Sequence, residues 1–248
     1  MIAEAPMQEA LFIPRYRPAR AGDWDVQIIG MNFLPGYWSG TALVRDTPIL
    51  LRGSVPWMSI SPQEIESQEI GIRLARGHVL IFGLGMGWAA AAAAANPAVA
   101  AVTIVERDPD VIALHRTLDP FAQLPASARG KLRLIESDAF AYAPDRPVDL
   151  LMPDIWQPMV SDGRLDEVRC MQENVGAASI YFWGQELEIV RHAVAAERAI
   201  DDDGIAATIA EIGLPLIGSD FPGYAQKSEA AARQWMCGRW LQGPPPGW

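Results

Sequence analysis

The 248-residue chain has only two cysteines, Cys170 and Cys237, which lie far apart and form no C-x-x-C pair. Disulfide frameworks and zinc sites need clustered cysteines, so both residues are expected to be free thiols in a reducing compartment. Histidine is equally scarce: His78, His115 and His192 fall on different expected elements without metal-ligand spacing. Each is interpreted as structural, and His192 is the histidine best placed for a catalytic role if one exists.

Positive charge is also in short supply. The chain has 20 Lys and Arg against 30 Asp and Glu, a net charge of −10, and only two of the cations are lysines. An acidic surface repels phosphate backbones, and no basic cluster offsets it, so no nucleic-acid partner is expected. The acidity would suit a cationic small-molecule substrate.

Long hydrophobic runs are rare too. The only long uncharged apolar run, residues 79–95, contains three glycines and seven alanines, which suits a turn and a buried helix better than a membrane span. The N-terminus lacks the basic-then-apolar pattern of a secretory signal. We therefore expect a cytoplasmic protein without a membrane partner.

Residues 77–110 carry the most informative pattern. A buried apolar run at 79–82 leads into three alternating glycines, Gly83, Gly85 and Gly87, then an alanine-rich helix and a second apolar run that ends on Glu106. Strand, glycine turn, helix, strand and acid are the parts of a nucleotide-binding βαβ unit. Glycine permits a sharp turn and close ligand approach, a helix N-terminus offers unpaired N–H groups, and the carboxylate can accept ribose hydroxyls. These residues, with Arg107 beside the acid, predict an adenosine-type cofactor site; the alternative is an ordinary turn with a solvated glutamate.

Departures from known nucleotide-binding motifs reduce the number of candidate cofactors. The dinucleotide motif G-x-G-x-x-G/A needs a small third residue, and this chain has Trp88 there. No G-x-x-x-x-G-K-[ST] loop occurs, which argues against a P-loop site. The G-x-G-x-G turn followed by V-E-R-D-P resembles the S-adenosylmethionine (AdoMet) site of class I methyltransferases and the related spermidine synthases.

That resemblance implies roles for residues after two later strands. An acid-plus-small pair that holds adenine in these families matches Asp138 and Ala139, although Asp138 can instead cap the next helix. Asp154 follows the fourth strand, near the reacting end of the cofactor. Its carboxylate can attract the sulfonium or the methionine ammonium, or accept a proton from a nucleophile. In spermidine synthases a second acid stands three residues later; here it is Gln157, and an amide is no base.

The resemblance also extends upstream. The segment W-M-S-I-S-P-Q-E is similar to one that precedes the glycine turn in a group of spermidine-synthase-like methyltransferases. The residues that match this group in order are Met58, Ser59, Pro62, Glu64, Gly83–Gly87, Glu106, Asp138 and the Asp-Ile-Trp run at 154–156. The resemblance implies a Rossmann-like AdoMet fold and says little about the substrate.

The expected fold class is α/β, a mainly parallel, doubly wound Rossmann-like sheet with a small N-terminal β element. We divide the chain into a β-hairpin element (1–56), an AdoMet-binding domain (57–200) and a C-terminal extension with a flexible Pro-rich tail (201–248). The expected strands are 79–83, 101–105, 131–136, 148–153 and 179–183, and the expected helices after the first strand are 86–96, 109–118, 164–175 and 185–199. Only a short apolar element, 205–212, is expected beyond residue 199, without the final strand pair usual in class I methyltransferases.

Three smaller interpretations concern individual side chains. Ser61, with Pro62 and Glu64, is expected to form a capping box at the start of a helix. Trp57, Trp156 and Trp183 fall near expected strand ends and are candidates to wall an aromatic substrate pocket. Asp162 and Glu186 are interpreted as surface caps.

The leading functional hypothesis is AdoMet-dependent methyl transfer to a small-molecule acceptor, with Asp154 at the reacting centre. One alternative is aminopropyl transfer to a polyamine, which Gln157 disfavours. Another is a non-catalytic module that binds AdoMet or serves an oligomer, and the chain is a candidate homo-oligomer.

Overall fold

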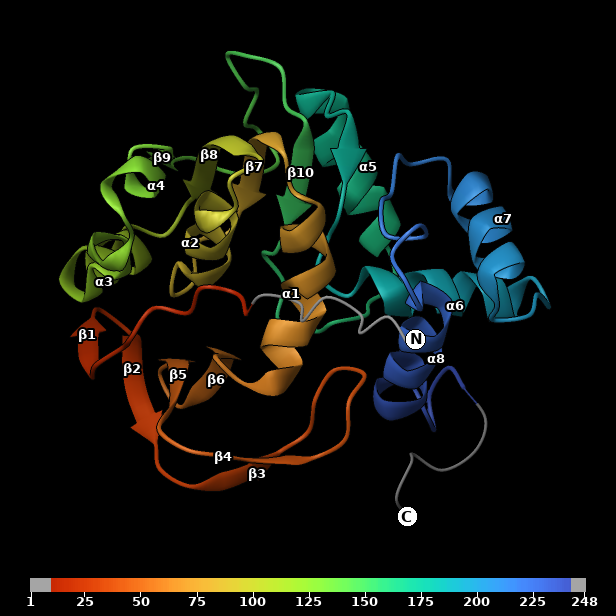
Figure 1. The fold of residues 1–248 in the computed structure, drawn as a ribbon, viewed down its shortest axis with the longest axis horizontal. Coiled ribbons are helices and arrows are strands. Elements are labelled where there is room, and N and C mark those ends of the chain that lie inside the picture. Colours follow the sequence, from red (N-terminus) through yellow and green to blue (C-terminus); the bar gives the residue numbers. More distant parts are fainter. Residues whose placement is uncertain (1–9, 242–248) are drawn as a thin grey trace, which may run out of the picture.

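A five-stranded parallel sheet forms the centre of the computed structural model, which describes residues 10–241 (Figure 1). Its strand order is β11-β10-β7-β8-β9, with every neighbouring pair parallel. The strands are β7 (Gly77–Phe82), β8 (Val99–Glu106), β9 (Leu132–Glu136), β10 (Leu150–Pro153) and β11 (Ser179–Ile180). The prediction of a Rossmann-like α/β fold is therefore confirmed.

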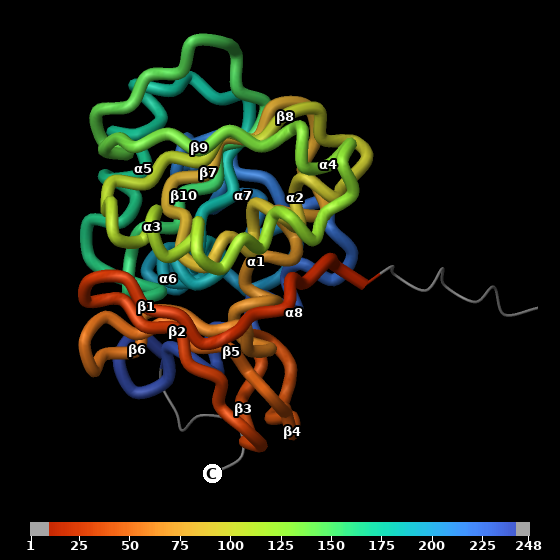
Figure 2. Tube along the Cα trace, turned by 90° about the vertical axis from the view of Figure 1, so that its left-hand side faces the viewer, coloured from red at the N-terminus to blue at the C-terminus, as the bar shows by residue number. Residues whose placement is uncertain are grey.

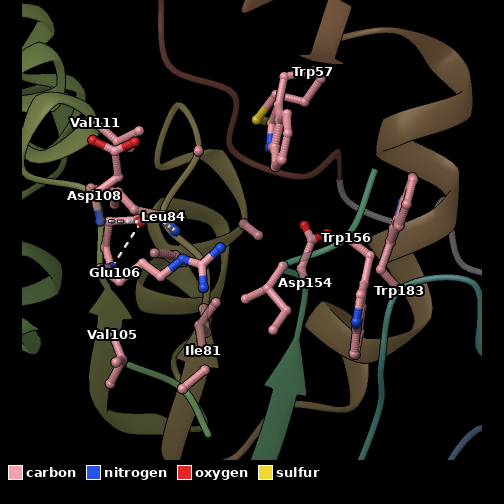
Figure 3. Close-up of a pocket in the computed structure, with 18 of the residues that line it drawn as sticks. Trp57, Ile81, Leu84, Val105, Glu106, Asp108, Val111, Asp154, Trp156 and Trp183 are labelled. Carbon is pink, nitrogen blue, oxygen red and sulfur yellow. Dashed lines mark hydrogen bonds between the residues drawn. The ribbon is translucent and has the colours of Figure 1, made fainter. Parts of the chain in front are cut away.

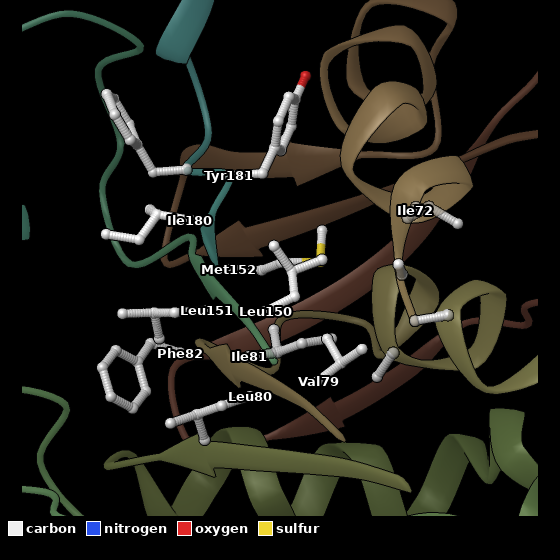
Figure 4. Packing of buried hydrophobic residues seen from close by; sticks show 14 of the residues in the cluster. Ile72, Val79, Leu80, Ile81, Phe82, Leu150, Leu151, Met152, Ile180 and Tyr181 are labelled. Atoms are coloured by element: carbon white, nitrogen blue, oxygen red, sulfur yellow. The ribbon is translucent and has the colours of Figure 1, made fainter. Parts of the chain in front are cut away.

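The central strands are buried on both faces. Leu80 and Phe82 of β7 point to one side of the sheet, and Val79 and Ile81 point to the other (Figure 4). Successive side chains of a strand alternate between faces, so a strand covered on both sides reads as a continuous apolar run. This is why residues 79–82 identify the first core strand without any alternation.

Helices alternate with these strands along the chain. Helices α2 and α3 pack on β8, and α5 packs on β10. The helices of this part are α1 (Pro62–Leu74), α2 (Trp88–Ala95), α3 (Pro109–Leu118), α4 (Ala126–Arg129), α5 (Arg164–Val175) and α6 (Gln185–Ala195), with a short 3-10 turn, η1 (Pro120–Gln123). Five of the seven alanines of α2, Ala90 to Ala94, are buried, because small side chains let the helix approach the sheet closely.

The N-terminal β element contains six short strands. Four strands form an antiparallel sheet in the order β1-β2-β5-β6, and β3 and β4 form a separate two-stranded ribbon (Figures 1 and 2). Their bounds are β1 (Ala19–Ala21), β2 (Trp24–Ile29), β3 (Asn32–Leu34), β4 (Ala42–Val44), β5 (Thr47–Arg52) and β6 (Val55–Ser59). The element thus extends past the predicted boundary at residue 56. The indole of Trp24 donates to the Asp108 carboxylate at 2.9 Å and ties it to the parallel sheet.

The C-terminal part differs most from expectation. The apolar element expected at 205–212 is the helix α7 (Asp202–Ile212), and a second, unpredicted helix, α8 (Tyr224–Trp235), packs against α6 and α7. Between residues 199 and 241 no strand pair forms beside β11, and Leu216 makes only an isolated parallel bridge to Ile180. The Pro-rich tail expected near the C-terminus lies in residues 242–248, outside the described range.

Several predicted elements are longer than the structure has them, among them the last strand and the helix after it. The strand expected at 179–183 ends at Ile180, although the Tyr181 and Trp183 N–H groups still donate to carbonyls of β10. The chain then turns at Gly184, with φ of 81°, into α6, which ends at Ala195 rather than residue 199.

Within residues 10–241 no helix combines the length and apolar character needed to cross a bilayer. Over the same range no three His, Cys, Asp or Glu side chains gather closely enough to hold a metal ion. Cys170 and Cys237 are both free, as predicted.

Candidate functional site

A cavity of about 290 Å³ opens at the carboxyl ends of the parallel strands (Figure 3). Its floor comes from the segments that follow β7, β8, β9 and β10, and its other walls come from α1 and the N-terminal sheet. The crevice beyond the carboxyl ends of the strands is where open α/β sheets bind ligands. The volume is close to the lower limit of small-molecule sites, about 300–1,000 Å³.

Seven of the eight predicted site residues line this cavity. They are Gly83, Gly85, Glu106, Arg107, Asp138, Ala139 and Asp154. Figure 3 shows Glu106 at one side and Asp154 at the other. We call the part near Gly83, Gly85, Glu106, Asp138 and Ala139 the glycine-turn end.

Gly87 is the predicted site residue that does not line the cavity. It precedes α2 with φ of 78°, and a Cβ there would lie 2.9 Å from the His115 ring. The glycine therefore serves packing against α3. His115 is buried beside Phe121, and burial lowers the pKa of its imidazole to about 4, so the ring is neutral. A neutral, buried ring agrees with the interpretation of His115 as structural.

Contacts inside the protein also explain the other two glycines. Both have positive φ, 96° at Gly83 and 49° at Gly85. A Cβ on Gly83 would lie 2.1 Å from the backbone carbonyl oxygen of Asp154, and one on Gly85 would lie 2.4 Å from the sulfur of Met58. The glycine pattern alone is therefore no proof of a ligand, and the case for one rests on the polar groups around it.

The Glu106 carboxylate is held by three backbone N–H groups. Oε2 accepts from Leu84 at 3.0 Å, and Oε1 accepts from Arg107 at 2.8 Å and Asp108 at 2.9 Å. A carboxylate has about four acceptor positions, so roughly one remains, on Oε2. The side chain is pre-oriented, with room to accept about one hydrogen bond from a ligand.

Asp138 and Ala139 lie together at the mouth of the glycine-turn end. Asp138 Oδ1 accepts from the Phe140 N–H at 2.9 Å, which stabilises a turn rather than a helix, and Oδ2 stays available. Ala139 is 6% exposed and presents a small apolar surface. A carboxylate and a flat apolar contact suit a heteroaromatic amine, and with Glu106 they make this end a fit for an adenosine group.

Asp154 is the centre of a polar group on the far side of the cavity. Its Oδ2 accepts a hydrogen bond from the Gln68 side-chain amide of α1 at 2.9 Å. Asp154 is half-buried and lines the cavity. Burial raises the pKa of this carboxyl, and the Arg164 guanidinium and the Gln68 hydrogen bond oppose that rise.

Glu64 shares this side of the cavity, which the sequence did not predict. Ser61 accepts a hydrogen bond from the Glu64 backbone N–H at 3.3 Å, as expected of an N-cap. No return bond completes the capping box: the Glu64 side chain, 5% exposed, lines the cavity instead. The signal that finds it is spacing, since Glu64 and Gln68 lie one helical turn apart on the same face of α1.

Tryptophans wall the same side, as predicted. Trp57, Trp156 and Trp183 all line the cavity (Figure 3), and Trp57 packs edge-to-face on Trp24 with ring centroids 5.3 Å apart. We call the part formed by Glu64, Asp154, Trp57, Trp156 and Trp183 the acid–tryptophan end.

Two of these indoles are fixed in position. Trp156 donates to Glu167 at 2.6 Å, and the Arg164 guanidinium stacks 3.9 Å from its ring centroid. Trp183 donates to the Ser67 hydroxyl at 2.9 Å. Anchored rings keep the cavity open because they cannot rotate into it without losing these contacts.

Other sequence candidates lie elsewhere. Gln157 is exposed, donates to the Pro56 carbonyl at 3.0 Å and does not line the cavity. His192 borders a separate shallow pocket with Arg169 and Arg198, so its catalytic interpretation has no support from position. His78 is structural, with its ring nitrogens 2.8 Å from the Pro147 carbonyl and 2.9 Å from the Thr103 hydroxyl.

The interpretation of Glu186 as a surface cap is wrong. Its side chain is fully buried, and it accepts hydrogen bonds from the Tyr181 hydroxyl at 2.8 Å and the Tyr37 hydroxyl at 3.3 Å. Helix α8 packs against α6 and encloses this part of it. Asp162 is exposed, as predicted, but it does not cap α5, whose N-cap is Gly163 without a side-chain hydrogen bond; Asp162 pairs with Arg191 at 2.9 Å instead.

No protein-family model and no curated protein matches the sequence. Among solved structures, the chain is similar to the glycopeptide N-methyltransferase MtfA in complex with S-adenosyl-L-homocysteine, at 23% identity over 44% of this chain and 43% of that one, with a TM-score of 0.36. The same enzyme with S-adenosyl-L-methionine aligns at 23% identity over 44% and 48% of the two chains, with a TM-score of 0.35. A SAM-dependent methyltransferase from Thiobacillus denitrificans aligns at 18% identity over 46% and 44%, with a TM-score of 0.36.

These alignments span less than half of either chain. The assignment of the fold therefore depends on the strand order of this chain itself. The resemblance to the spermidine-synthase-like group stays a prediction.

Proposed function

We propose that this chain is an AdoMet-dependent methyltransferase that acts on a small molecule. The observation that carries the proposal is the division of one cavity into two chemically different ends. One end offers oriented carboxylates beside a glycine turn, and the other offers a buried acid among tryptophans. A cofactor with an adenosine group and a sulfonium needs such an arrangement.

At the glycine-turn end, Glu106 accepts from a ribose hydroxyl through Oε2, and Asp138 accepts from the exocyclic amine of adenine. Ala139 contacts the base. Asp154 lies toward the sulfonium, where its negative charge is attracted to the positive sulfur. Bound AdoMet would supply an electrophilic methyl group, and the protein contributes by holding the acceptor nucleophile in line with it.

The test is calorimetric titration with AdoMet, S-adenosylhomocysteine (AdoHcy) and NAD. We expect the wild-type protein to bind the first two and not NAD. Glu106→Gln keeps the size of the side chain but removes its charge, so both affinities should fall about tenfold to a hundredfold, as for a hydrogen bond to a charged group of about 1.5–3 kcal/mol.

Glu136→Gln is the matched control. Glu136 pairs with Glu106 in register at the end of the neighbouring strand but is exposed and outside the cavity lining. Its variant should bind both ligands like the wild type. Tighter binding of NAD than of AdoHcy, or equal effects of the two substitutions, would contradict the proposal.

A further inference from the structure

Within residues 10–241 the Glu64 carboxylate has no hydrogen-bond or ion-pair partner. It is 5% exposed and lines the cavity. Gln68, one turn away, donates to Asp154 instead. The carboxylate oxygens are not sealed inside the protein but open onto the cavity, so they are available to a ligand that donates a hydrogen bond.

The charged groups near Glu64 favour a cation at this end of the cavity. Asp154 receives a hydrogen bond from Gln68 and feels the Arg164 guanidinium, whereas Glu64 has neither. Burial raises the pKa of Glu64 well above its usual range, and the negative charge of Asp154 raises it further. Two neighbouring carboxylates share a proton unless a cation lies between or beside them.

The walls of the acid–tryptophan end suit a cation as well. Trp57 and Trp183 line this end together with Trp156, whose ring already stacks with Arg164, and an ammonium group close to the electron-rich face of an indole is stabilised. An anionic acceptor would meet repulsion from both carboxylates. A neutral alcohol or thiol would leave the second carboxylate uncompensated.

We propose that the acceptor is a primary or secondary amine that enters as its ammonium, and that Glu64 receives it and takes one of its protons. An N–H bond breaks, its electron pair stays on nitrogen as the lone pair, and the proton is bound by a Glu64 carboxylate oxygen. This inference rests on the proposed function, because that lone pair is what a methyl acceptor needs.

A rival assignment pairs Glu64 with the ammonium of the cofactor's own methionine part. The two assignments differ in one measurable respect. AdoHcy carries the same ammonium as AdoMet, so under the rival assignment Glu64→Gln would weaken AdoHcy binding. Under our proposal the substitution leaves AdoHcy affinity within about twofold of the wild type.

The experiment is calorimetric titration of AdoHcy-saturated protein with 2-phenylethylamine, N-methyl-2-phenylethylamine, 1,4-diaminobutane, and the matched alcohols 2-phenylethanol and 1,4-butanediol. We expect at least one amine to bind, and at least tenfold more tightly than its alcohol. Glu64→Gln should reduce the amine affinity at least tenfold. Glu69→Gln is the control. Glu69 lies on the same helix, outside the cavity lining, and pairs with Arg73 at 2.7 Å, so its substitution should change neither the amine affinity nor the AdoHcy affinity.

Equal binding of amine and alcohol overturns the inference, as does the absence of binding by every amine. So does a Glu64→Gln variant that loses AdoHcy and keeps the amine. Thermal unfolding of each variant verifies that it is folded. Failure of the wild type to bind AdoHcy contradicts the proposed function instead, and titration of the cofactor-free protein then tests Glu64 alone.

Discussion

The indole N–H of Trp235 donates a hydrogen bond to the backbone carbonyl of Tyr37 at 3.0 Å, across 198 positions of the chain. The neighbouring Gln234 side chain donates to the Gly36 carbonyl at 2.7 Å. Helix α8 thus holds the loop before β4 in place, and the buried ring of Tyr37 carries its hydroxyl to Glu186. The loop at residues 36–37, helix α8 and helix α6 are therefore linked by hydrogen bonds.

Trp235→Phe should lower the free energy of unfolding by about 1 kcal/mol, because a partly buried carbonyl loses its donor while most of the apolar contact stays. Urea denaturation measures the change. Trp240→Phe is the control: its ring stacks with Arg239 at 3.9 Å, and its N–H makes no hydrogen bond among the described residues. Equal changes for the two variants would contradict the assignment.

Stability should fall as the pH rises from about 4 to about 7. Burial raises the pKa of Glu186 from 4.5 to about 7, against the opposing hydrogen bonds from the tyrosine hydroxyls. Between these values the folded state holds a proton that the unfolded state has released, so each pH unit removes up to about 1.4 kcal/mol. The stabilisation is complete below the unfolded pKa and lost above the folded one.

Glu186→Gln should flatten that part of the profile, because the amide cannot titrate and can still accept from Tyr181. Urea midpoints at several pH values from 4 to 8 give the measurement. Glu211→Gln, at an exposed position of α7, is the control and should keep the wild-type slope. A Glu186→Gln profile as steep as that of the wild type would disprove the role of this carboxyl.

The sequence predicted the parallel sheet well because the signals are local. Four core strands are short apolar runs, and the glycine turn and Glu106 stand within one βαβ unit. At the acid–tryptophan end the sequence predicted Asp154 but not Glu64. Asp154 follows a strand in the chain, whereas Glu64 reaches the cavity from a helix that precedes the sheet.

The wrong interpretations of Gly87 and Glu186 have one physical cause, which is tertiary burial. Gly87 belongs to the glycine pattern, yet the ring of His115 takes the space beside it. Glu186 has the sequence context of an exposed helix start, yet α8 covers it. Neither relationship lies within one element, so neither has a local signature.

Gly83→Ala and Gly85→Ala should differ in cost. Both force a side chain into positive φ, about 1–2 kcal/mol. At Gly83 the new Cβ meets a backbone carbonyl that cannot move cheaply, so the loss of stability should exceed that amount. At Gly85 it meets the flexible Met58 side chain, which can shift.

Double variants with Met58→Ala separate these costs in urea denaturation. Met58→Ala should reduce the penalty of Gly85→Ala and leave that of Gly83→Ala unchanged. Gly53→Ala has φ of 59° and nothing near its Cβ, so it measures the backbone cost alone. Equal coupling of Met58 to both glycines would show that the turn rearranges as a unit.

AdoMet affinity should rise with pH, and AdoHcy affinity should not. Burial raises the pKa of Asp154 to about 7, with Arg164 and the Gln68 hydrogen bond opposing the rise, and Glu64 lies on the same side of the cavity. Above this pKa the carboxylate is charged and attracts a sulfonium, so affinity for the cation should increase up to about tenfold per unit as the pH approaches 7 from below, and then level off. AdoHcy has a neutral thioether at the same position and gains nothing from that charge.

Calorimetry at pH values from 5.5 to 8.5 with both ligands measures the difference. Asp154→Asn is uncharged throughout, so its AdoMet profile should become as flat as that of AdoHcy. A steep AdoHcy profile in the wild type that disappears in Asp154→Asn would place Asp154 beside the methionine ammonium, because that group is common to both ligands. The comparison therefore distinguishes the two positions for Asp154 without requiring knowledge of the acceptor.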